Sequence, residues 1–324
     1  MPVYDLGNGN DHFNSASKAD WTNDSSVFGG NGDDAIAARA LSPTYTSRLF
    51  IDGGNGNDTV LLDASNSVAL GGNGDDTLTS TGGLGNTLVG GNGDDLLISV
   101  GGGSGMGPGN TLTGGLGRDS FRLVNDGNLV VTKDADANGV VSDGDVFVGP
   151  MDVITDYQRG EHIGLRNYDV SANGPATADT PVARVDSVAL APDPLAHTGD
   201  SFRPVIGSQQ YAVFHGTFAG VNSFTVNSSG PDLFVVYDTR TGPNELVGKG
   251  SLVLLGQSDT QLVAQALSSA TTGGAGGGWA FSGQAGGSGG ASFDMGSEDQ
   301  ATGSVPASLD PAVASLSATG LIPT

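Results

Sequence analysis

Six aspartates recur between residues 6 and 122, and each of them closes a short glycine-rich phrase. The copy at residues 29–34 reads Gly-Gly-Asn-Gly-Asp-Asp; its glycines permit a tight turn and let backbone carbonyls come close to a ligand. Calcium takes about six to eight oxygen ligands from carboxylates and carbonyls, and such a turn offers both kinds. The repeated pattern therefore predicts several Ca2+ sites, whose sixth-position acids are Asp11, Asp34, Asp58, Asp76, Asp95 and Asp119.

The other positions of each turn are expected to contribute backbone carbonyls and further side-chain oxygens. The first turn is a degenerate copy, and the sixth carries Arg118 where the other turns carry Asp or Asn. A cation there would compete with calcium, so the sixth turn is predicted to end the series. The remaining candidate ligand positions are Gly7 and Gly9; Gly29, Gly30, Asn31, Gly32 and Asp33; Gly53, Gly54, Asn55, Gly56 and Asn57; Gly71, Gly72, Asn73, Gly74 and Asp75; Gly90, Gly91, Asn92, Gly93 and Asp94; Gly115 and Gly117.

An apolar residue stands two places after each of these aspartates, which predicts a short strand with one inward side chain after every turn. Successive aspartates are 23, 24, 18, 19 and 24 residues apart, and the longer separations fit insertions at 38–48 and 99–107. A flexible glycine-rich segment is the alternative interpretation, but several copies in register disfavour it. The apolar residues are Phe13, Ile36, Val60, Leu78, Leu97 and Phe121.

The repeated phrase matches G-G-x-G-x-D-x-U-x, and by it the chain resembles the RTX proteins, a family of calcium-binding nonapeptide-repeat proteins. The resemblance implies a parallel β-roll in which two nonapeptides make one coil. We therefore expect an all-β fold, with a calcium-binding RTX β-roll over 1–124, a β-rich region over 125–256, a short helix over 257–270 and a Gly/Ser-rich tail over 271–324. Asn86 and Asn110 replace the acid in half-repeats, so we expect a one-sided ladder with each ion between successive turns.

A second metal motif lies at residues 134–145, where polar residues have the ligand spacing of an EF-hand loop and Gly139 takes the sixth position. The expected ligands are Asp134, Asp136, Asn138, the carbonyl of Val140, and Asp145. The twelfth position is Asp rather than the usual bidentate Glu, so a weaker site is expected, and a plain acidic turn is the alternative. No helical pattern flanks the loop; residues 129–132 and 146–148 have strand-like sequences.

Residues 152–165 resemble the segment that follows the roll in many RTX proteins. The resemblance carries Asp152 and Asp156 over as metal ligands, while His162 replaces a further acid of the family pattern. A strand, turn and strand that cap the roll are the alternative. Further strands are predicted at 182–190, 211–215, 223–226, 232–237 and 251–255.

Composition supports a cation-binding protein. Thirty-five acids against 12 bases give a net charge of −23, which argues against nucleic acid and anionic membranes as partners. Self-repulsion should oppose the compact state until cations bind. The chain has no cysteine, no apolar run of membrane-spanning length and no N-terminal signal-peptide pattern, so direct membrane insertion is not expected. Residues alone would suggest a cytosolic protein, whereas the RTX resemblance implies export by a bacterial type I secretion system through an uncleaved C-terminal signal.

No catalytic motif stands out, and we expect no enzyme. The four histidines form no H-E-x-x-H, and a literal G-x-S-x-G at 286–290 lies in low-complexity sequence without a strand before it. Three classes of function remain: an extracellular structural protein that self-assembles on calcium binding, a monomeric calcium-dependent adhesin or binding module, and an enzyme with an unrecognised site in 146–256.

Self-assembly is the favoured hypothesis, as a filament, surface layer or biofilm matrix component. Five residues before the first repeat make a poor cap, so an unpaired strand edge should pair head-to-tail with another copy of the chain. The alternative is that residues 2–5 and 15–28 fold over this end and leave a monomer.

Overall fold

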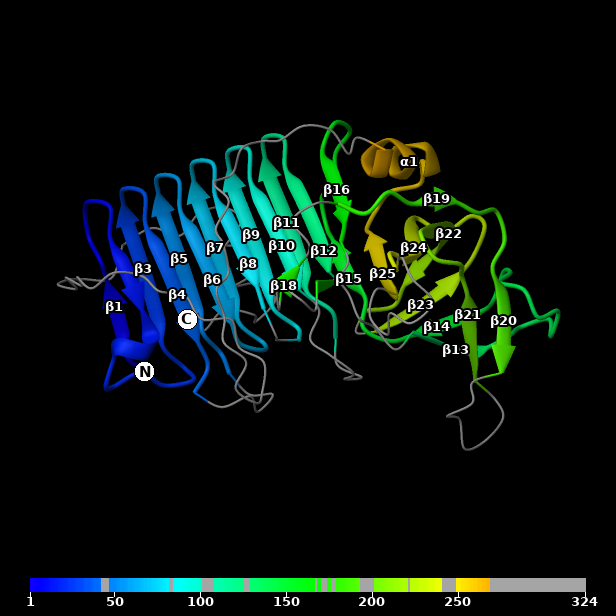
Figure 1. The fold of residues 1–324 in the computed structure, drawn as a ribbon, viewed down its shortest axis with the longest axis horizontal. Helices are drawn as coiled ribbons and strands as arrows, with labels where there is room; N and C mark the ends of the chain where they lie inside the picture. Colours follow the sequence, from blue (N-terminus) through cyan, green and yellow to red (C-terminus); the bar gives the residue numbers. More distant parts are fainter. Residues whose placement is uncertain are drawn as a thin grey trace. The chain divides into compact units, whose positions relative to one another are not determined.

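The computed structural model describes residues 1–41, 47–81, 84–100, 108–124, 129–166, 168–169, 174–175, 179–192, 201–220, 222–240 and 249–268. The expected secretion signal in 271–324 lies outside these residues. The described chain forms two compact units, one from Met1–Val100 and Thr111–Phe121, the other from 108–110 and 122–268. Both are built almost wholly of strands, as the sequence predicted (Figure 1).

The first unit is a parallel β-roll of two sheets, which confirms the expected fold class. The chain passes from one sheet to the other after every strand, so each coil contributes one strand to each sheet (Figure 1). One sheet holds β1 (Val3–Asp5), β3 (Ser26–Asn31), β5 (Phe50–Asn55), β7 (Val68–Asn73), β9 (Thr87–Asn92) and β11 (Thr111–Leu116). The other holds β2 (His12–Asn14), β4 (Ala35–Arg39), β6 (Thr59–Asp63), β8 (Thr77–Ser80), β10 (Leu96–Val100) and the start of β12 (Ser120–Val124).

The repeats stack in register along the first unit. Gly30, Gly54, Gly72, Gly91 and Gly115 pair in succession between neighbouring strands, so the same position of each turn lies above its counterpart. The apolar residue after each turn points into the space between the sheets, and all six are at most 1% exposed. Their uniform burial confirms that the repeat spacing sets the coil length.

The connection between β2 and β3 closes over the first coil. It contains the 3-10 helix η1 (Ser15–Ser17) and Trp21, whose ring lies 5.9 Å from that of Tyr4 and 5.6 Å from that of Phe13. The ammonium of Lys18 stands 5.4 Å from the centre of the Phe13 ring, a cation–π arrangement. The indole Nε1 of Trp21 donates to the Arg39 carbonyl at 2.6 Å. Trp21, 4% exposed, thus adds its ring to the core of the first coil.

The second unit is mainly an antiparallel sheet. Its strand order is β15 (Asp152–Ile154), β25 (Lys249–Leu254), β24 (Asp232–Asp238), β22 (Gln210–Phe218), β23 (Ser223–Val226), β14 (Val146–Val148), β13 (Val130–Lys133), β21 (Phe202–Val205) and β20 (Ala189–Pro192), with β19 (Ala183–Arg184) on β22. The unit also holds β16 (His162–Leu165), the pair β17 (Tyr168–Asp169) and β18 (Gly174–Pro175), and helix α1 (Thr260–Ser268). Phe147, Phe224 and Phe234 form its aromatic centre, with ring centroids 4.9 and 4.7 Å apart.

The strands predicted at 211–215, 223–226, 232–237 and 251–255 are confirmed, and the predicted helix at 257–270 is described from Thr260 to Ser268. The single strand predicted at 182–190 is wrong: β19 and β20 are separate, with a bend at Asp186 between them. Residues 186–187 are exposed and polar, so they interrupt the alternation that a continuous strand needs.

Candidate metal centre

The sixth-position aspartates form a continuous ladder along one side of the roll. Each backbone N–H donates to the Oδ1 atom of the aspartate in the next turn, so one oxygen of each acceptor carboxylate is fixed by the neighbouring coil. The distances are 2.8 Å from Asp11 to Asp34, 2.8 Å from Asp34 to Asp58, 2.7 Å from Asp58 to Asp76, 2.8 Å from Asp76 to Asp95 and 3.0 Å from Asp95 to Asp119.

The second oxygen of these carboxylates has no such donor. Oδ2 is buried and accepts no hydrogen bond in Asp11, Asp34, Asp58, Asp76 and Asp95. The last four of these residues are at most 2% exposed. Buried carboxylate oxygens nearly always have a partner, because desolvating a charge without one is costly. A row of such atoms on the same face is the arrangement expected of ligands for a cation.

The first glycine of each turn leaves space beside this oxygen. A Cβ atom built on Gly53 would lie 2.5 Å from Oδ2 of Asp58 and 2.6 Å from the carbonyl oxygen of Gly71 in the next turn. A carboxylate oxygen and a carbonyl oxygen therefore converge on a place that no side chain occupies. Gly29, Gly71 and Gly90 repeat the arrangement, each with its own aspartate and the carbonyl of the next turn. This donor set of hard oxygens fits Ca2+.

Burial and mutual repulsion raise the pKa values of the ladder acids. Burial is the main cause in each case, and the neighbouring aspartates add to it. The pKa rises to about 6 for Asp34, to about 7 for Asp58 and Asp95, and to about 8 for Asp76 in the middle of the ladder. A divalent cation beside these groups would favour the ionised form and reverse the effect.

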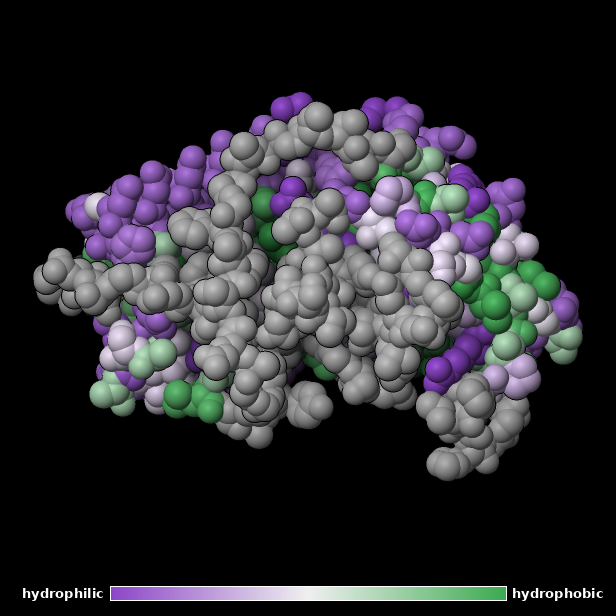
Figure 2. Space-filling model, in the orientation of Figure 1, coloured by the Kyte–Doolittle hydropathy of each residue, from purple (hydrophilic) through white to green (hydrophobic). Residues whose placement is uncertain are grey.

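Two outer ladders flank the acidic one on the hydrophilic surface over the turns (Figure 2). At the third position, asparagine side chains donate to one another, as from Asn55 to Asn31 at 2.9 Å. At the fifth position, each backbone N–H donates to the side chain at the fifth position of the preceding turn, as from Asn57 to Asp33 at 2.8 Å. Asn8 and Asn10 take part in the first turn, although only its glycines and aspartate are predicted ligands.

The sixth turn ends both outer ladders. Leu116 stands at the third position, 70% exposed, and it has no amide to continue the asparagine series. Arg118 stands at the fifth position; its N–H donates to Oδ1 of Asp94 at 2.8 Å, and its guanidinium lies 3.6 Å from the second oxygen. Arg118 therefore pairs with an acid of the preceding turn.

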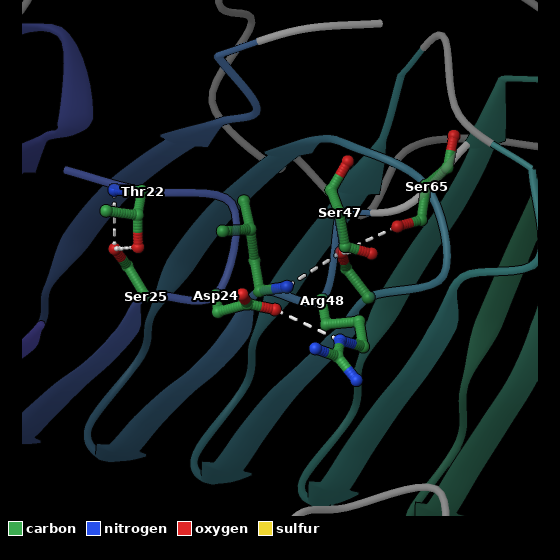
Figure 3. A network of polar contacts seen from close by, with 8 residues as sticks. Thr22, Asp24, Ser25, Ser47, Arg48 and Ser65 are labelled. Carbon is green, nitrogen blue, oxygen red and sulfur yellow. Dashed lines mark hydrogen bonds and ion pairs between the residues drawn. The ribbon is translucent and has the colours of Figure 1, made fainter. Parts of the chain in front are cut away.

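The opposite side of the roll carries a mostly neutral ladder. Leu49 N–H donates to Ser67 Oγ at 3.0 Å, and Ser67 N–H donates to Asn86 Oδ1 at 2.9 Å. Figure 3 shows the serine-rich loops on this side, where the Arg48 guanidinium Nε donates to Asp24 at 3.0 Å. Sequence reasoning missed Ser67, although it precedes Asn86 by 19 residues, the length of one coil.

In the second unit, the predicted ligand Asp152 accepts a hydrogen bond from the Asn110 N–H at 2.8 Å and is 2% exposed. Asp156 follows β15 and is partly exposed. Neither belongs to the acidic cluster that the described residues contain, which consists of Asp134, Asp136 and Asp145.

That cluster confirms the spatial convergence predicted for the loop at 134–145. One carboxylate oxygen from each of its three aspartates lies within 4.8 Å of the others. Asp145 is fully buried; its two oxygens accept from Ala135 N–H at 2.7 Å and from Ser142 N–H at 2.9 Å. Oδ1 of Asp134 is buried and accepts no hydrogen bond.

The remaining loop positions also match the EF-hand pattern. Gly139 has φ 73°, the left-handed conformation expected at the sixth position. The Asn138 side chain donates to Asp136 at 2.7 Å, and Val140 forms a bridge with Ala189. The loop joins β13 to β14 in a hairpin, so strands and not helices hold it, as expected.

Comparison with known proteins adds no relative: no protein-family model matches the chain, and no match was found among curated proteins. The resemblance to RTX proteins therefore rests on the repeats themselves. Within the described residues, no helix is long and apolar enough to cross a membrane.

Proposed function

We propose that this chain is a secreted calcium-binding structural protein that folds, and associates with itself, when it meets calcium outside the cell. The observation that carries the proposal is the series of buried carboxylate oxygens without a hydrogen-bond donor along one side of the roll. Calcium would satisfy these oxygens, offset the repulsion between the ladder acids and hold successive turns together. The 134–145 loop would bind a further ion in the second unit.

Calcium suits these sites better than other common metal ions. The ladder offers only carboxylate and carbonyl oxygens, whereas zinc and copper prefer nitrogen or sulfur ligands. Magnesium demands a compact octahedron and gives up its waters reluctantly, while calcium accepts irregular sets of oxygens. Sites of this kind fill at extracellular calcium concentrations, which supports export through the type I pathway that the RTX resemblance implies.

One open strand edge supports self-association. Among the described strands, β1 pairs only with β3, whereas β20 pairs with β21 on one side and is bonded on its other side by residues 139–140 of the loop. An unpaired edge is a template for pairing with another chain. A contact between β1 of one copy and a different surface of the next would be head-to-tail, and such a contact builds a filament or a sheet.

One observation favours the second candidate, a monomeric calcium-dependent adhesin or binding module. Suppose that a second copy of the chain stacked its first turn on the sixth turn of the first copy. The Asn8 amide of the second copy would then face Leu116 of the first, and its Asn10 N–H would face Arg118. Neither residue offers the oxygen that the ladder uses elsewhere. Head-to-tail growth through the turns is therefore disfavoured, and self-association depends on the strand edge of β1.

The proposal is tested by circular dichroism of the full chain during calcium titration. We expect chelation to remove most of the β signal of the roll, and calcium in the millimolar range to restore it cooperatively. Magnesium at the same concentration is the control and should restore little. Identical spectra with chelator and with calcium would refute the calcium-dependent fold, whatever the state of association.

A further inference from the structure

An ion cluster in the second unit is distinct from both calcium sites. Strand β16 presents His162, Gly164 and Arg166 on one face, because alternate residues of a strand point the same way. The carboxylate of Asp179 lies across Gly164, where a Cβ atom would be 2.5 Å from Oδ1 and 2.7 Å from Oδ2. His162 Nε2 lies 2.7 Å from Oδ2, and Arg166 Nε donates to Oδ1 at 2.7 Å. Both oxygens of the Asp179 carboxylate are thus engaged.

Arg122 is a further cation beside this cluster. It lies on β12, whose Leu123 carbonyl accepts from the Arg166 N–H at 2.9 Å. Burial, together with the charge of Arg166, lowers the pKa of the Arg122 guanidinium, and the charge of Asp179 opposes that change. The Nε atom of Arg122 is buried and has no hydrogen-bond partner.

Among the described residues, no carboxylate lies within ion-pair distance of Arg122, although the charge of Asp179 acts on it. Other described arginines find a carboxylate within ion-pair distance, although most of them are more exposed: Arg39, Arg48, Arg118, Arg159, Arg166, Arg184 and Arg240. Burial alone would raise the pKa of Asp179, but the hydrogen bonds and charges of His162 and Arg166 lower it to about 2. Asp179 is therefore ionised at neutral pH and balances Arg166, which leaves the charge of Arg122 unbalanced.

We propose that Arg122, supported by Arg166 and His162, binds a small oxyanion. The guanidinium offers a planar set of N–H donors that matches carboxylate, sulfate or phosphate oxygens, and Nε–H is one of these donors. A bound oxyanion would give this buried donor its acceptor and balance the local charge. None of its residues is a proposed calcium ligand, so the site adds a second kind of ligand to the proposed function.

Isothermal titration of the calcium-loaded full chain tests the site, with sodium sulfate and sodium acetate as probes at matched ionic strength. We expect saturable binding of one anion, and a difference between the two probes reports whether a tetrahedral or a planar oxyanion is preferred. Arg122→Gln should weaken binding by about tenfold or more, as expected for the loss of a charged hydrogen bond. Arg159→Gln, which removes an exposed arginine of the same unit, should leave binding unchanged.

Folding is monitored separately in each variant. Because an unbalanced buried cation is removed, Arg122→Gln without anion should unfold at a temperature no lower than the parent chain. Arg122→Lys keeps the charge but lacks Nε–H, so it should bind more weakly than the parent and provides a second test. Equal binding in the parent chain and both variants, or no saturable heat with either probe, would overturn the proposal. Neither outcome bears on calcium binding.

Discussion

At the scale of single residues, the two oxygens of each ladder carboxylate have different roles. In Asp76, Oδ1 accepts the N–H of Asp58, while Oδ2 lies beside the first glycine of its turn and the Gly90 carbonyl. The first oxygen aligns neighbouring coils with or without metal. The second is costly without a cation and, under the proposed function, would become a ligand for one. The same side chain would then oppose the metal-free fold and stabilise the calcium-bound fold.

Replacing Asp76 by Asn separates these roles. The amide keeps an oxygen for the Asp58 N–H and places a donor near the Gly90 carbonyl, so the metal-free chain should be at least as stable as the parent. With calcium at about 100 times its dissociation constant, each lost ion removes about 2.7 kcal/mol of stabilisation. Thermal unfolding with chelator and with calcium measures both effects.

Asp75→Asn is the matched control: Asp75 is also a candidate ligand, but asparagine keeps a side-chain oxygen at this fifth position, as Asn57 does in the preceding turn. It should bind the same number of ions as the parent by native mass spectrometry, whereas Asp76→Asn should bind fewer. Asn110→Ala, on the side without the acidic ladder, should also keep the parent number. Equal loss of ions in Asp76→Asn and Asn110→Ala would contradict a one-sided ladder.

The raised pKa values also predict how the metal-free fold responds to pH. The ordinary value is 3.8, and the folded values of Asp34, Asp58, Asp76 and Asp95 lie at about 6 to 8. Between these limits the folded state binds more protons than the unfolded state, so the free energy of unfolding falls as pH rises. The chelated chain should therefore be more stable at pH 5 than at pH 8.

Calcium should reverse that order, because it binds the ionised carboxylates and competes with protons. Circular dichroism at the two pH values, with chelator and with calcium, measures the folded fraction of the roll in the four conditions. A chelated chain that is more stable at pH 8 would show that the ladder acids are not protonated in the metal-free fold.

At the scale of the element, the first residue of a turn decides whether a site can form. Four turns begin with a glycine that faces its own aspartate and the carbonyl of the next turn, namely Gly29, Gly53, Gly71 and Gly90. In the first turn that position belongs to Leu6, which is 5% exposed. We therefore expect ladder ions between the second and sixth turns, and none between the first and second.

Leu6→Gly tests this expectation. Removing the side chain should open the missing space beside Asp11 and raise the calcium stoichiometry by one, although the loss of a buried leucine lowers stability by about 2 to 5 kcal/mol. Leu6→Ala is the control, since it keeps the Cβ atom and loses most of the same packing. Native mass spectrometry that shows the same extra ion in both variants would argue against the role of the first glycine.

The 134–145 loop is the corresponding element of the second unit. It is tied to two neighbouring segments by three contacts: Asp143 accepts from Ser228 N–H at 3.0 Å, Gly144 N–H donates to the Val226 carbonyl at 2.8 Å, and Val141 N–H donates to the Val188 carbonyl at 2.9 Å. An ion held by the loop would stabilise all three contacts, because each begins within a few residues of the acidic cluster.

Asp134→Asn combined with Asp136→Asn should remove about one ion and leave the roll folded. Asp143→Asn is the control, because Asp143 contacts Ser228 and is not part of the cluster. Hydrogen exchange should show faster exchange in 188–190 and 223–228 of the double variant, with the roll unaffected. An unchanged ion count by calorimetry would remove the loop from the calcium sites.

At the scale of the whole molecule, the sequence predicted the repeating parts well and the irregular parts poorly. The roll follows from a local rule, because a glycine turn, an acid and one apolar residue recur at coil-length intervals. The neutral ladder through Ser67 was missed because serine at a half-repeat carries no signal alone. Asp152 is predicted as a ligand from its motif, and the structure adds that its Oδ1 accepts the Asn110 N–H, a donor that only the tertiary fold brings near.

Self-association also belongs to this scale, and the backbone of β1 allows a specific test. Leu6 N–H donates to the Phe28 carbonyl, and Ser26 N–H donates to the Pro2 carbonyl, so alternate residues of β1 face β3. By that alternation, the N–H of Val3 points away from β3, towards the open edge. Val3→Pro removes this donor without breaking the pairing of β1 with β3. Polymers that grow through the β1 edge should therefore be lost, while calcium binding by the ladder stays at the parent level.

Val3→Thr is the control, because it keeps both the β-branched shape and the outward N–H. Light scattering and electron microscopy of calcium-loaded protein should show polymers for the parent chain and Val3→Thr, and single particles for Val3→Pro. Polymers that survive in Val3→Pro would place the contact elsewhere than the β1 edge. A parent chain that stays monomeric with calcium would instead favour the monomeric binding module. Leu116 and Arg118 already prevent the outer ladders of one copy from continuing into the first turn of the next.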